Sequence, residues 1–456
     1  MNKSPDTYSE TSADFTVTHR KVAGIAVPVT LAYISTPLVG LADTWTIGQL
    51  GDAALIGAIA VGGILFDILF STMSFLRTGT TGLVAQAFGA GKPREEVAIL
   101  LRALVIALGL GVVLSLAQGP ALSIGLWFIG GSAEVQAAVI TYFSVRVLAA
   151  PLALANYAIL GYFLGRGQAM TGLLLQTVLN LTNIALNIWF VLGLGWGVEG
   201  VAAASVLGEL AALFVGGALI IRQCRKVPMP ARAEVFERAA LLQMLGVNRD
   251  IMIRSFALLF AFATFTRLSA QQGEVVLAAN AILEKFFLIS GYFLDGIAVA
   301  AEQLVGRAVG AKRKTPFVRT VKLCAFWAVL LSSIAMTFFF VAGGPIIEAM
   351  TPAQEVRDVA LAFLVFAALT PVVGALAFLM DGVYIGATWS RDMRNMMLLS
   401  LVIYLAAAYT LLPTFGNMGL WIAFLIFLGI RGVTLSMALP RRMNATFHDA
   451  QSPAAI

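Results

Sequence analysis

The sequence predicts an all-α membrane protein: twelve transmembrane helices in two six-helix lobes, related by a pseudo-two-fold axis along the membrane normal. Three observations support this prediction: the apolar composition, the number of long apolar stretches and an internal repeat. Of the 456 residues, 59% are hydrophobic and only 12% are charged, against about 45–50% and about 25% in soluble domains. A chain of this composition is expected to lie in a lipid bilayer.

Twelve apolar stretches are long enough to cross a bilayer, which takes about 20 helical residues. They lie at about residues 22–45, 53–76, 97–118, 136–163, 170–194, 199–221, 250–268, 276–303, 322–343, 357–383, 395–413 and 418–437. The first 19 residues contain Lys3, Asp6, Glu10 and Asp14 and no apolar core before Thr18. No cleaved signal peptide is therefore expected, and the first apolar run stays as a helix.

Charged residues between the spans predict the orientation. The loops after even-numbered spans contain Lys92, Arg94, Arg166, Arg222, Arg225, Lys226, Arg232, Arg238, Arg307, Lys312, Arg313, Lys314, Arg391 and Arg394. The opposite loops are acidic apart from Arg357. By the positive-inside rule both termini are expected in the cytoplasm. The net charge of +6 is then mainly a topology signal, with contact to anionic lipid as the alternative, and nucleic acid is not an expected partner.

Three pairs of segments reveal the repeat. "LVAQAFGAGK" at 83–92 matches "LVGRAVGAKR" at 304–313, "LGYFLGRG" at 160–167 matches "DGVYIGAT" at 381–388, and "WGVEGVAAA" at 196–204 matches "FGNMGLWIA" at 415–423. They occur in one order and at nearly one offset, which indicates two six-helix halves. Because six is even, both halves have the same orientation in the membrane, and a cavity is expected between them.

The predicted organisation has five parts. They are a cytoplasmic tail at 1–21, an N-lobe at 22–221, a basic cytoplasmic linker at 222–247 with an amphipathic segment "AEVFERAALLQML", a C-lobe at 248–438 and a cytoplasmic tail at 439–456. The two cysteines and the two histidines lack metal-binding spacing, so no metal site or other cofactor is expected.

Several segments resemble one transporter family. They are "PLVGLADTWTIGQLG", "FLRTGTTGLVAQAFGAG" after the second span, "NRDIMIRS", "YFLDGIAVAAEQLVGRAVGA" and "DGVYIGATWSRDMRN". Together they resemble the DinF branch of the multidrug and toxic compound extrusion (MATE) transporters. The resemblance implies an inner-membrane antiporter that exports amphipathic, often cationic, organic compounds in exchange for protons or sodium. We expect the transporter to be a monomer.

Asp43 is the main candidate for coupling. An ionisable residue inside a span is a functional candidate by default, although an N-cap or an interface position is the alternative. The resemblance implies that the aspartate of the first span, in the matching VDT-type motif, binds the coupling cation. Pro28 and Pro37 each remove a backbone donor, so they could let this helix bend, or they could be packing kinks.

The fifth span carries a stripe of asparagines. Asn180, Asn183 and Asn187 are spaced i, i+3 and i+7 and so share one helix face. Interhelical hydrogen bonding is the structural alternative to a binding site. We favour a binding site, because three amides on one stripe offer more polar capacity than packing against one neighbour requires. We assign Asn183 and Asn187, with Asp43, to the coupling site and Asn180, with Asn156, to the substrate. Relatives often have aspartate where this chain has Asn187, and the amide favours protons over sodium.

Other acids compete with Asp43. Asp67, Glu209 and Glu284 stay open as proton relays or second cation sites. Asp295, Glu302 and Asp381 are expected to pair with basic loop residues, and Asp250 with Arg254 four residues on. Arg146 is the expected partner of one buried acid.

Three functions remain open. The first is the cation-coupled exporter of small molecules. The second is a flippase for a lipid-linked precursor, which would need several cations for pyrophosphate, and the third, the least favoured, is an intramembrane enzyme. No G-x-x-x-x-G-K-[ST] segment occurs, so the chain is not expected to hydrolyse ATP. We therefore expect a gradient-driven transporter and no enzyme.

Overall fold

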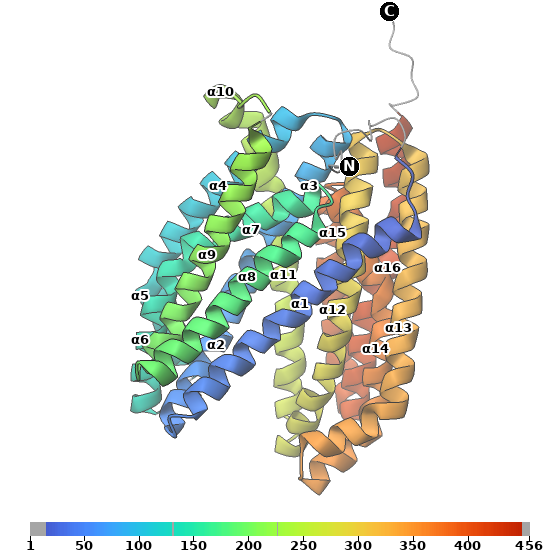
Figure 1. Ribbon diagram of the computed structural model, residues 1–456. Coiled ribbons are helices and arrows are strands. Elements are labelled where there is room, and N and C mark those ends of the chain that lie inside the picture. Colours follow the sequence, from blue (N-terminus) through green and yellow to red (C-terminus); the bar gives the residue numbers. More distant parts are fainter. Residues whose placement is uncertain (1–14, 130–131, 226, 449–456) are drawn as a thin grey trace, which may run out of the picture. The chain divides into compact units, whose positions relative to one another are not determined.

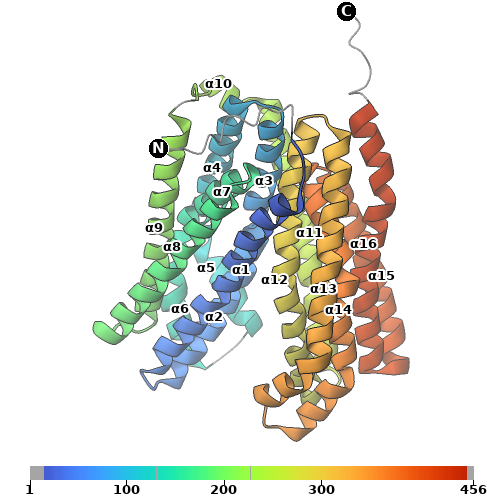
Figure 2. The same ribbon diagram turned by 45° about the vertical axis from the view of Figure 1, so that its right-hand side comes forward.

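The computed structural model describes residues 15–129, 132–225 and 227–448, and these residues form helices without strands (Figures 1 and 2). In chain order the α-helices are α1 (His19–Gly48), α2 (Ala53–Met73), α3 (Phe75–Gly89), α4 (Pro93–Leu116), α5 (Gln118–Ile129), α6 (Ala133–Arg146), α7 (Ala150–Gly165), α8 (Ala169–Ile188), α9 (Val198–Cys224), α10 (Arg232–Val235), α11 (Arg238–Ala270), α12 (Glu274–Gly310), α13 (Lys314–Met350), α14 (Gln354–Gly386), α15 (Ser390–Phe415) and α16 (Asn417–His448). A short 3₁₀ turn, η1 (Val147–Ala149), joins α6 to α7, and a π turn, η2 (Trp189–Gly193), ends α8.

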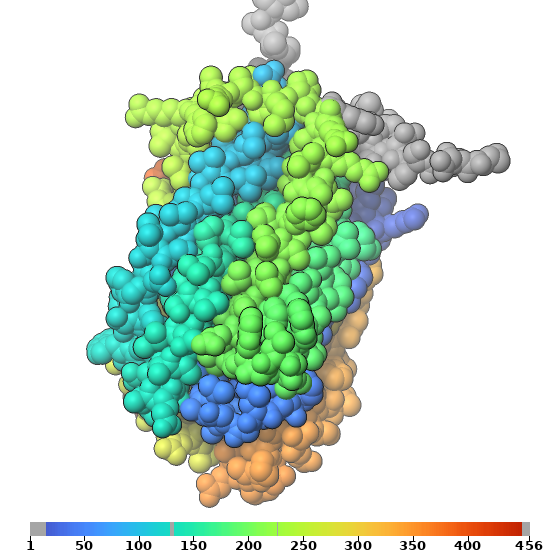
Figure 3. Space-filling view, turned by 60° about the vertical axis from the view of Figure 1, so that its left-hand side comes forward, coloured from blue at the N-terminus to red at the C-terminus, as the bar shows by residue number. Residues whose placement is uncertain are grey.

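Twelve helical segments in the described part of the chain are long and apolar enough to cross a membrane. This number confirms the prediction. Four of the segments join consecutive helical elements: Ala53–Gly89 across α2 and α3, Ala133–Gly165 across α6, η1 and α7, Ala169–Gly193 across α8 and η2, and Arg232–Ala270 across α10 and α11. The spanning helices expose large apolar side chains, as contact with lipid requires: Leu116 of α4 and Phe214 of α9 are 79% and 77% exposed. Figure 3 shows the side on which α9 and the helices around α4 form the surface.

Three predicted boundaries were wrong by more than ten residues. The twelfth span was expected to end at 437, but α16 continues to His448. The segment expected as a loop after the second span is helical and forms α3 as far as Gly89. The seventh span was expected to begin at 250, but α11 begins at Arg238, so part of the predicted linker is the first three turns of this helix. Hydropathy marks only the part of a helix in hydrocarbon, and these helices continue beyond it.

The chain forms two compact units. The N-terminal unit comprises Leu31–Val84 and Lys92–Asn248, and the C-terminal unit comprises residues up to Thr30, Ala85–Gly91 and the chain from Arg249 onward. The boundary falls inside three helices, α1, α3 and α11. In α1 it lies two residues after Pro28.

Equivalent glycines pack the helices of each half in the same way. A Cβ atom on Gly161 of α7 would lie 2.5 Å from the carbonyl oxygen of Arg77, and one on Gly382 of α14 would lie 2.1 Å from that of Ala298. Gly161 and Gly382, like Arg77 and Ala298, are 221 positions apart. Gly165 on the Thr81 carbonyl and Gly386 on the Glu302 carbonyl repeat the pattern one turn later. The glycines allow backbones to approach closely, which is the common way to pack helices in membranes.

The two copies of the repeat also meet each other within the C-terminal unit. A Cβ on Gly89 would lie 2.1 Å from the Arg307 carbonyl oxygen, and one on Gly310 would lie 1.9 Å from the Gln86 carbonyl oxygen. Gly89 and Gly310 are equivalent in the repeat, and so are Gln86 and Arg307. The contact is therefore reciprocal, as a two-fold relation between the copies requires at this point.

These contacts predict the effect of adding one methyl group. We expect Gly382→Ala to destabilise the protein by about 1–3 kcal/mol, because the new Cβ meets a rigid carbonyl rather than a flexible side chain. Gly374→Ala on the same helix is the control, since its Cβ would meet only side chains at ordinary contact distances, Phe378 at 3.6 Å and Leu428 at 3.9 Å. Thermal unfolding in detergent measures both. Equal melting temperatures would contradict the close contact.

Candidate functional site

Asp43 lies inside α1 and is buried. Its exposed fraction is 4%, and α1 continues for five residues beyond it to Gly48. The N-cap at this end of the unit is instead Asp52, whose carboxylate accepts hydrogen bonds from the backbone of Ala54 and Leu55 at the start of α2. The N-cap interpretation of Asp43 was therefore wrong.

Asn187 of α8 holds the Asp43 carboxylate. Its Nδ2 donates to Asp43 Oδ1 at 2.6 Å, and both side chains are buried. The amide oxygen of Asn187 is also buried and accepts no hydrogen bond from the described residues. The π turn η2 begins two residues later, and turns of this kind are frequent at functional sites.

The other two asparagines of the stripe are buried on the same face but contact different partners. Asn183 donates to Ser205 Oγ of α9 at 3.0 Å, and its own amide oxygen has no donor among the described residues. Asn180 donates to Ser35 Oγ of α1 at 2.8 Å. Since Ser35 and Asp43 both contact α8, the stripe joins α8 to α1 over two turns and to α9 between them.

Arg146 of α6 is the cation whose charge acts on Asp43. Its guanidinium donates to the Tyr142 hydroxyl and lies 4.7 Å from the centre of the Phe66 ring. Its charge acts on Asp43, Asp67 and Glu209. The direct ion pair expected for Arg146 is not among the ion pairs of the described residues, because the tyrosine hydroxyl and the ring faces occupy the guanidinium instead.

A second acid–amide pair lies in the same unit. Asn156 Nδ2 of α7 donates to the carboxylate of Glu209 at 2.6 Å and to its backbone carbonyl oxygen at 2.8 Å. Both residues are half-buried. The structure thus joins two candidates that the sequence suggested separately, while Asp67 on α2 is exposed.

Glu284 belongs to the C-terminal unit, on α12. It is half-buried, and its Oε1 atom is buried without a hydrogen-bond partner among the described residues. The hydroxyl of the fully buried Tyr404 on α15 also lacks a hydrogen-bond partner among the described residues. The Tyr404 hydroxyl and the Glu284 carboxylate interact electrostatically.

The predicted pair of Asp250 and Arg254 was wrong. Asp250 accepts from Arg394 at 2.7 Å and from Ser390 at 3.2 Å, at the start of α15. Arg254 donates to Asp381 of α14 at 3.2 Å. Asp250 and Asp381 are buried, and a buried carboxylate is stabilised by converging donors from several helices more than by one neighbour on its own helix.

Asp381 also has other partners than expected. The strongest is Arg431 of α16, at 2.7 Å, and this guanidinium is 3% exposed. Arg431 and Arg254 both lie within helices, not in loops. The carboxylate therefore ties α11, α14 and α16 together.

Sequence reasoning missed Ser35 and Ser205. Ser35 lies about two turns before Asp43 on α1, and this spacing could have placed it on the same helix face as Asp43. Ser205 had no signal, because serine is common on the packed faces of membrane helices.

A polytopic bundle with buried carboxylates and amides in its spans belongs to the class of membrane transporters. The comparisons with known proteins specify the family: the chain matches the MatE family over residues 28–189 and 251–410 and belongs to it. It is thus a MATE transporter.

Two similar proteins span nearly the whole chain. The sequence is 34% identical to DNA damage-inducible protein F of Escherichia coli (strain K12), over 93% of this chain and 92% of that protein. It is 27% identical to the chloroplastic protein DETOXIFICATION 44 of Arabidopsis thaliana, over 92% and 82%. The first similarity confirms the DinF branch.

The fold agrees with solved structures. A multidrug resistance MATE family transporter of the MOP superfamily, in an outward-facing conformation, superposes with a TM-score of 0.84 and 19% identity, over 94% of this chain and 96% of that one. The likeness confirms the two-lobe fold.

The ion pairs of Asp381 predict a large loss of stability on truncation. We expect Asp381→Ala to cost about 3–5 kcal/mol, because Arg431 and Arg254 then stay buried without their counter-charge. Asp392→Ala removes the partner of Arg442, whose side chain is 46% exposed, and should cost at most about 1 kcal/mol. Thermal unfolding of the two variants in detergent checks the difference. A similar loss in both would show that the buried pairs do not stabilise the C-terminal unit.

Proposed function

We propose that this transporter is a secondary active antiporter that exports amphipathic, often cationic, organic compounds in exchange for protons by alternating access. The observation that carries the proposal is the Asp43 carboxylate, buried in a membrane-spanning helix and hydrogen-bonded to Asn187. A buried carboxylate without an ion pair can be neutralised by a proton or by a cationic substrate, and these two then compete.

The amide oxygens support protonation at this position. The Asn187 amide donates to one carboxylate oxygen of Asp43, while its own oxygen lacks a donor. A protonated Asp43 has an O–H donor, which would satisfy this oxygen. The site therefore offers hydrogen bonds to both forms of the acid.

Movement of α1 would couple protonation to export. Pro28 and Pro37 lie within α1, which is one continuous helix here. Loss of the charge on Asp43 would change the balance of contacts between α1 and α8, and the prolines are the positions at which α1 lacks backbone hydrogen bonds. Bending of α1 would then close the substrate pocket, in which we place Asn180 and Asn156.

Protons are the favoured coupling ion and sodium is the alternative. Sodium, as a hard cation, prefers charged oxygen ligands. The site around Asp43 offers one carboxylate together with amide and hydroxyl oxygens.

We place the protein in the bacterial inner membrane, with both termini in the cytoplasm and one chain as the working unit. The basic loops support the orientation, and the bacterial relative supports the location. The flippase alternative needs several cations around a pyrophosphate. It is disfavoured, because the cations that act in this region, Arg146 and Arg77, are outnumbered by the carboxylates of Asp43, Asp67 and Glu209.

Asp43→Asn tests the coupling role. The amide mimics the neutral acid in shape, so the variant should insert and unfold like the parent. It should lose pH-driven transport and the proton release that accompanies substrate binding. Proton release from purified protein, in weak buffer with a pH indicator, measures this directly. Asp52→Asn is the control: asparagine caps a helix as well as aspartate does, so release should be unchanged. Undiminished release from Asp43→Asn would assign the coupling to another acid.

Asn187→Asp tests the ion preference. A second carboxylate 2.6 Å from Asp43 should favour a bound cation, so transport should become sensitive to sodium or shift its pH optimum. Gln49→Glu adds the same charge on an exposed residue just beyond the end of α1, outside the substrate pocket, and should change neither. Transport into proteoliposomes with and without sodium at several pH values distinguishes the variants. If Asn187→Asp matches the parent in both dependences, the ion does not bind at α8.

A further inference from the structure

The chain around the start of α13 contains basic residues without acidic ones. Between residues 303 and 347 there is no Asp or Glu. The six basic residues of this stretch are Arg307, Lys312, Arg313, Lys314, Arg319 and Lys322. A run of one sign this long needs counter-charge from elsewhere.

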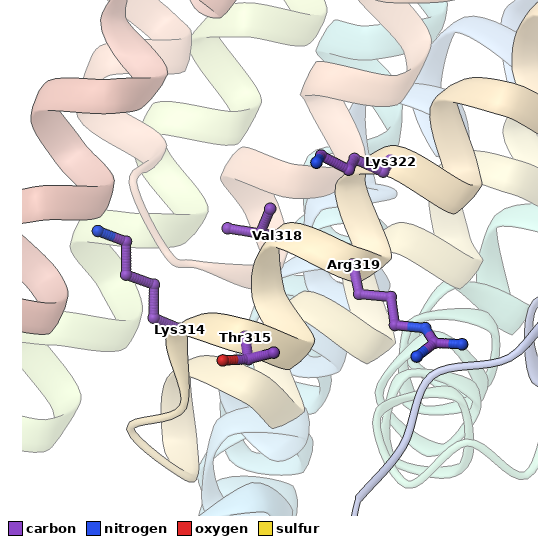
Figure 4. Close-up of a pocket in the computed structure, with 5 residues that line it drawn as sticks. All are labelled: Lys314, Thr315, Val318, Arg319 and Lys322. Atoms are coloured by element: carbon purple, nitrogen blue, oxygen red, sulfur yellow. The ribbon is translucent and has the colours of Figure 1, made fainter.

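Three of these cations line one pocket. Lys314, Arg319 and Lys322, with Thr315 and Val318, line a pocket of about 560 Å³ on α13. Figure 4 shows Lys314 and Arg319 extending to opposite sides, with Lys322 further along the helix. Lys314 and Lys322 are eight residues apart, or roughly 12 Å along the axis. All three cations are exposed.

None of the three cations forms an ion pair with a described residue. Lys314 Nζ donates to the neutral Asn444 Oδ1 at 3.3 Å, and Arg319 and Lys322 have no acidic partner in the part of the chain that the structure describes. The three like charges therefore repel one another, which an anion in the pocket would relieve.

The equivalent helix of the other half provides an internal comparison. In the repeat, α13 corresponds to α4, which has Glu95 and Glu96 in its first turn. The basic residues there are paired: Arg94 binds Glu234 at 2.9 Å, and Arg102 binds Glu95 at 2.6 Å. The basic residues at the start of α4 are thus neutralised by carboxylates. The equivalent helix α13 has no carboxylates at its start.

The pocket lies where α13 leaves the membrane. No charged residue follows Lys322 until Glu348, so the rest of α13 is uncharged through its spanning length. Lysine and arginine at such a boundary keep their charged ends at the level of the lipid headgroups. An anion at this depth, beside an apolar helix, is most simply a lipid phosphate.

We propose that this pocket binds the phosphodiester headgroup of an anionic phospholipid. Arg319 offers a planar fork that matches the oxygens of one phosphate. Lys314, which extends to the opposite side, offers charge to a second phosphate, and Lys322 adds charge further along the helix. The Thr315 hydroxyl can donate to a phosphate oxygen, and Val318 lies against the apolar part of the lipid. The spread of the cations over two turns favours a lipid with two phosphates, such as cardiolipin. The proposal does not depend on the transported substrate or on Asp43.

Lipid titration of delipidated full-length protein in detergent tests this, with native mass spectrometry as the readout. We expect cardiolipin to bind at least tenfold more tightly than phosphatidylcholine. In the triple variant Lys314→Gln, Arg319→Gln, Lys322→Gln this preference should be lost, since each cation contributes about fivefold. The control triple variant Arg222→Gln, Arg225→Gln, Arg232→Gln removes the same charge from exposed residues at the end of α9 and at α10 and should keep the preference.

Three outcomes would overturn the proposal. The first is equal binding of cardiolipin and phosphatidylcholine by the parent. The second is an equal loss in both triple variants, which would show a general charge effect. The third is displacement of cardiolipin by millimolar inorganic phosphate, which would identify a soluble anion as the ligand. The melting temperatures of both variants without added lipid check folding, and single Arg319→Gln, expected to weaken cardiolipin about fivefold, tests the site if the triple variant unfolds.

Discussion

Close approach of helix backbones is the constraint on which the rest of this structure depends. In hydrocarbon, apolar side chains gain little by leaving lipid for one another, so helices associate through tight packing and interhelical hydrogen bonds. Here the glycines of α7 pack directly against backbone carbonyls of α3, and the glycines of α14 pack against backbone carbonyls of α12. The buried polar contacts lie within bundles that are already held together, which is why an amide and a carboxylate can be kept at 2.6 Å.

The structure holds buried carboxylates in two ways. In the C-terminal unit Asp381 and Asp250 each meet guanidinium groups from other helices, and these pairs fix the positions of the helices. In the N-terminal unit Asp43 and Glu209 meet amides, while Arg146 is bound to a tyrosine and ring faces. An acid held by amides can lose its charge without leaving a cation unpaired. An acid held by two arginines cannot do so without large cost. Asp43 and Glu209 can therefore be neutralised at lower cost than Asp381 and Asp250.

Most of the fold could be predicted from the sequence, because the relevant signals are local. Apolar length reveals each span, and the spacing of Asn180, Asn183 and Asn187 reveals one helix face. The partners across helices were harder. Asp250 and Arg254 have the spacing of a helical pair, yet each turns to a different neighbour. Ser35 and Ser205 complete the asparagine contacts, and no periodicity distinguishes them from other serines. Such partners are set by packing between helices, which a single sequence does not record.

The reciprocal contact between Gly89 and Gly310 also bears on the ancestry of the chain. Each glycine meets the carbonyl of the residue equivalent to the one that its counterpart meets. This is the contact that two identical six-helix proteins would make as a symmetric dimer. After duplication and fusion the contact needs both copies, whereas a proton-binding acid needs only one. The position equivalent to Asp43 is Thr264, so one copy has the carboxylate and the other a neutral hydroxyl. The packing contact is thus present in both copies, whereas the buried carboxylate of α1 is present in only one.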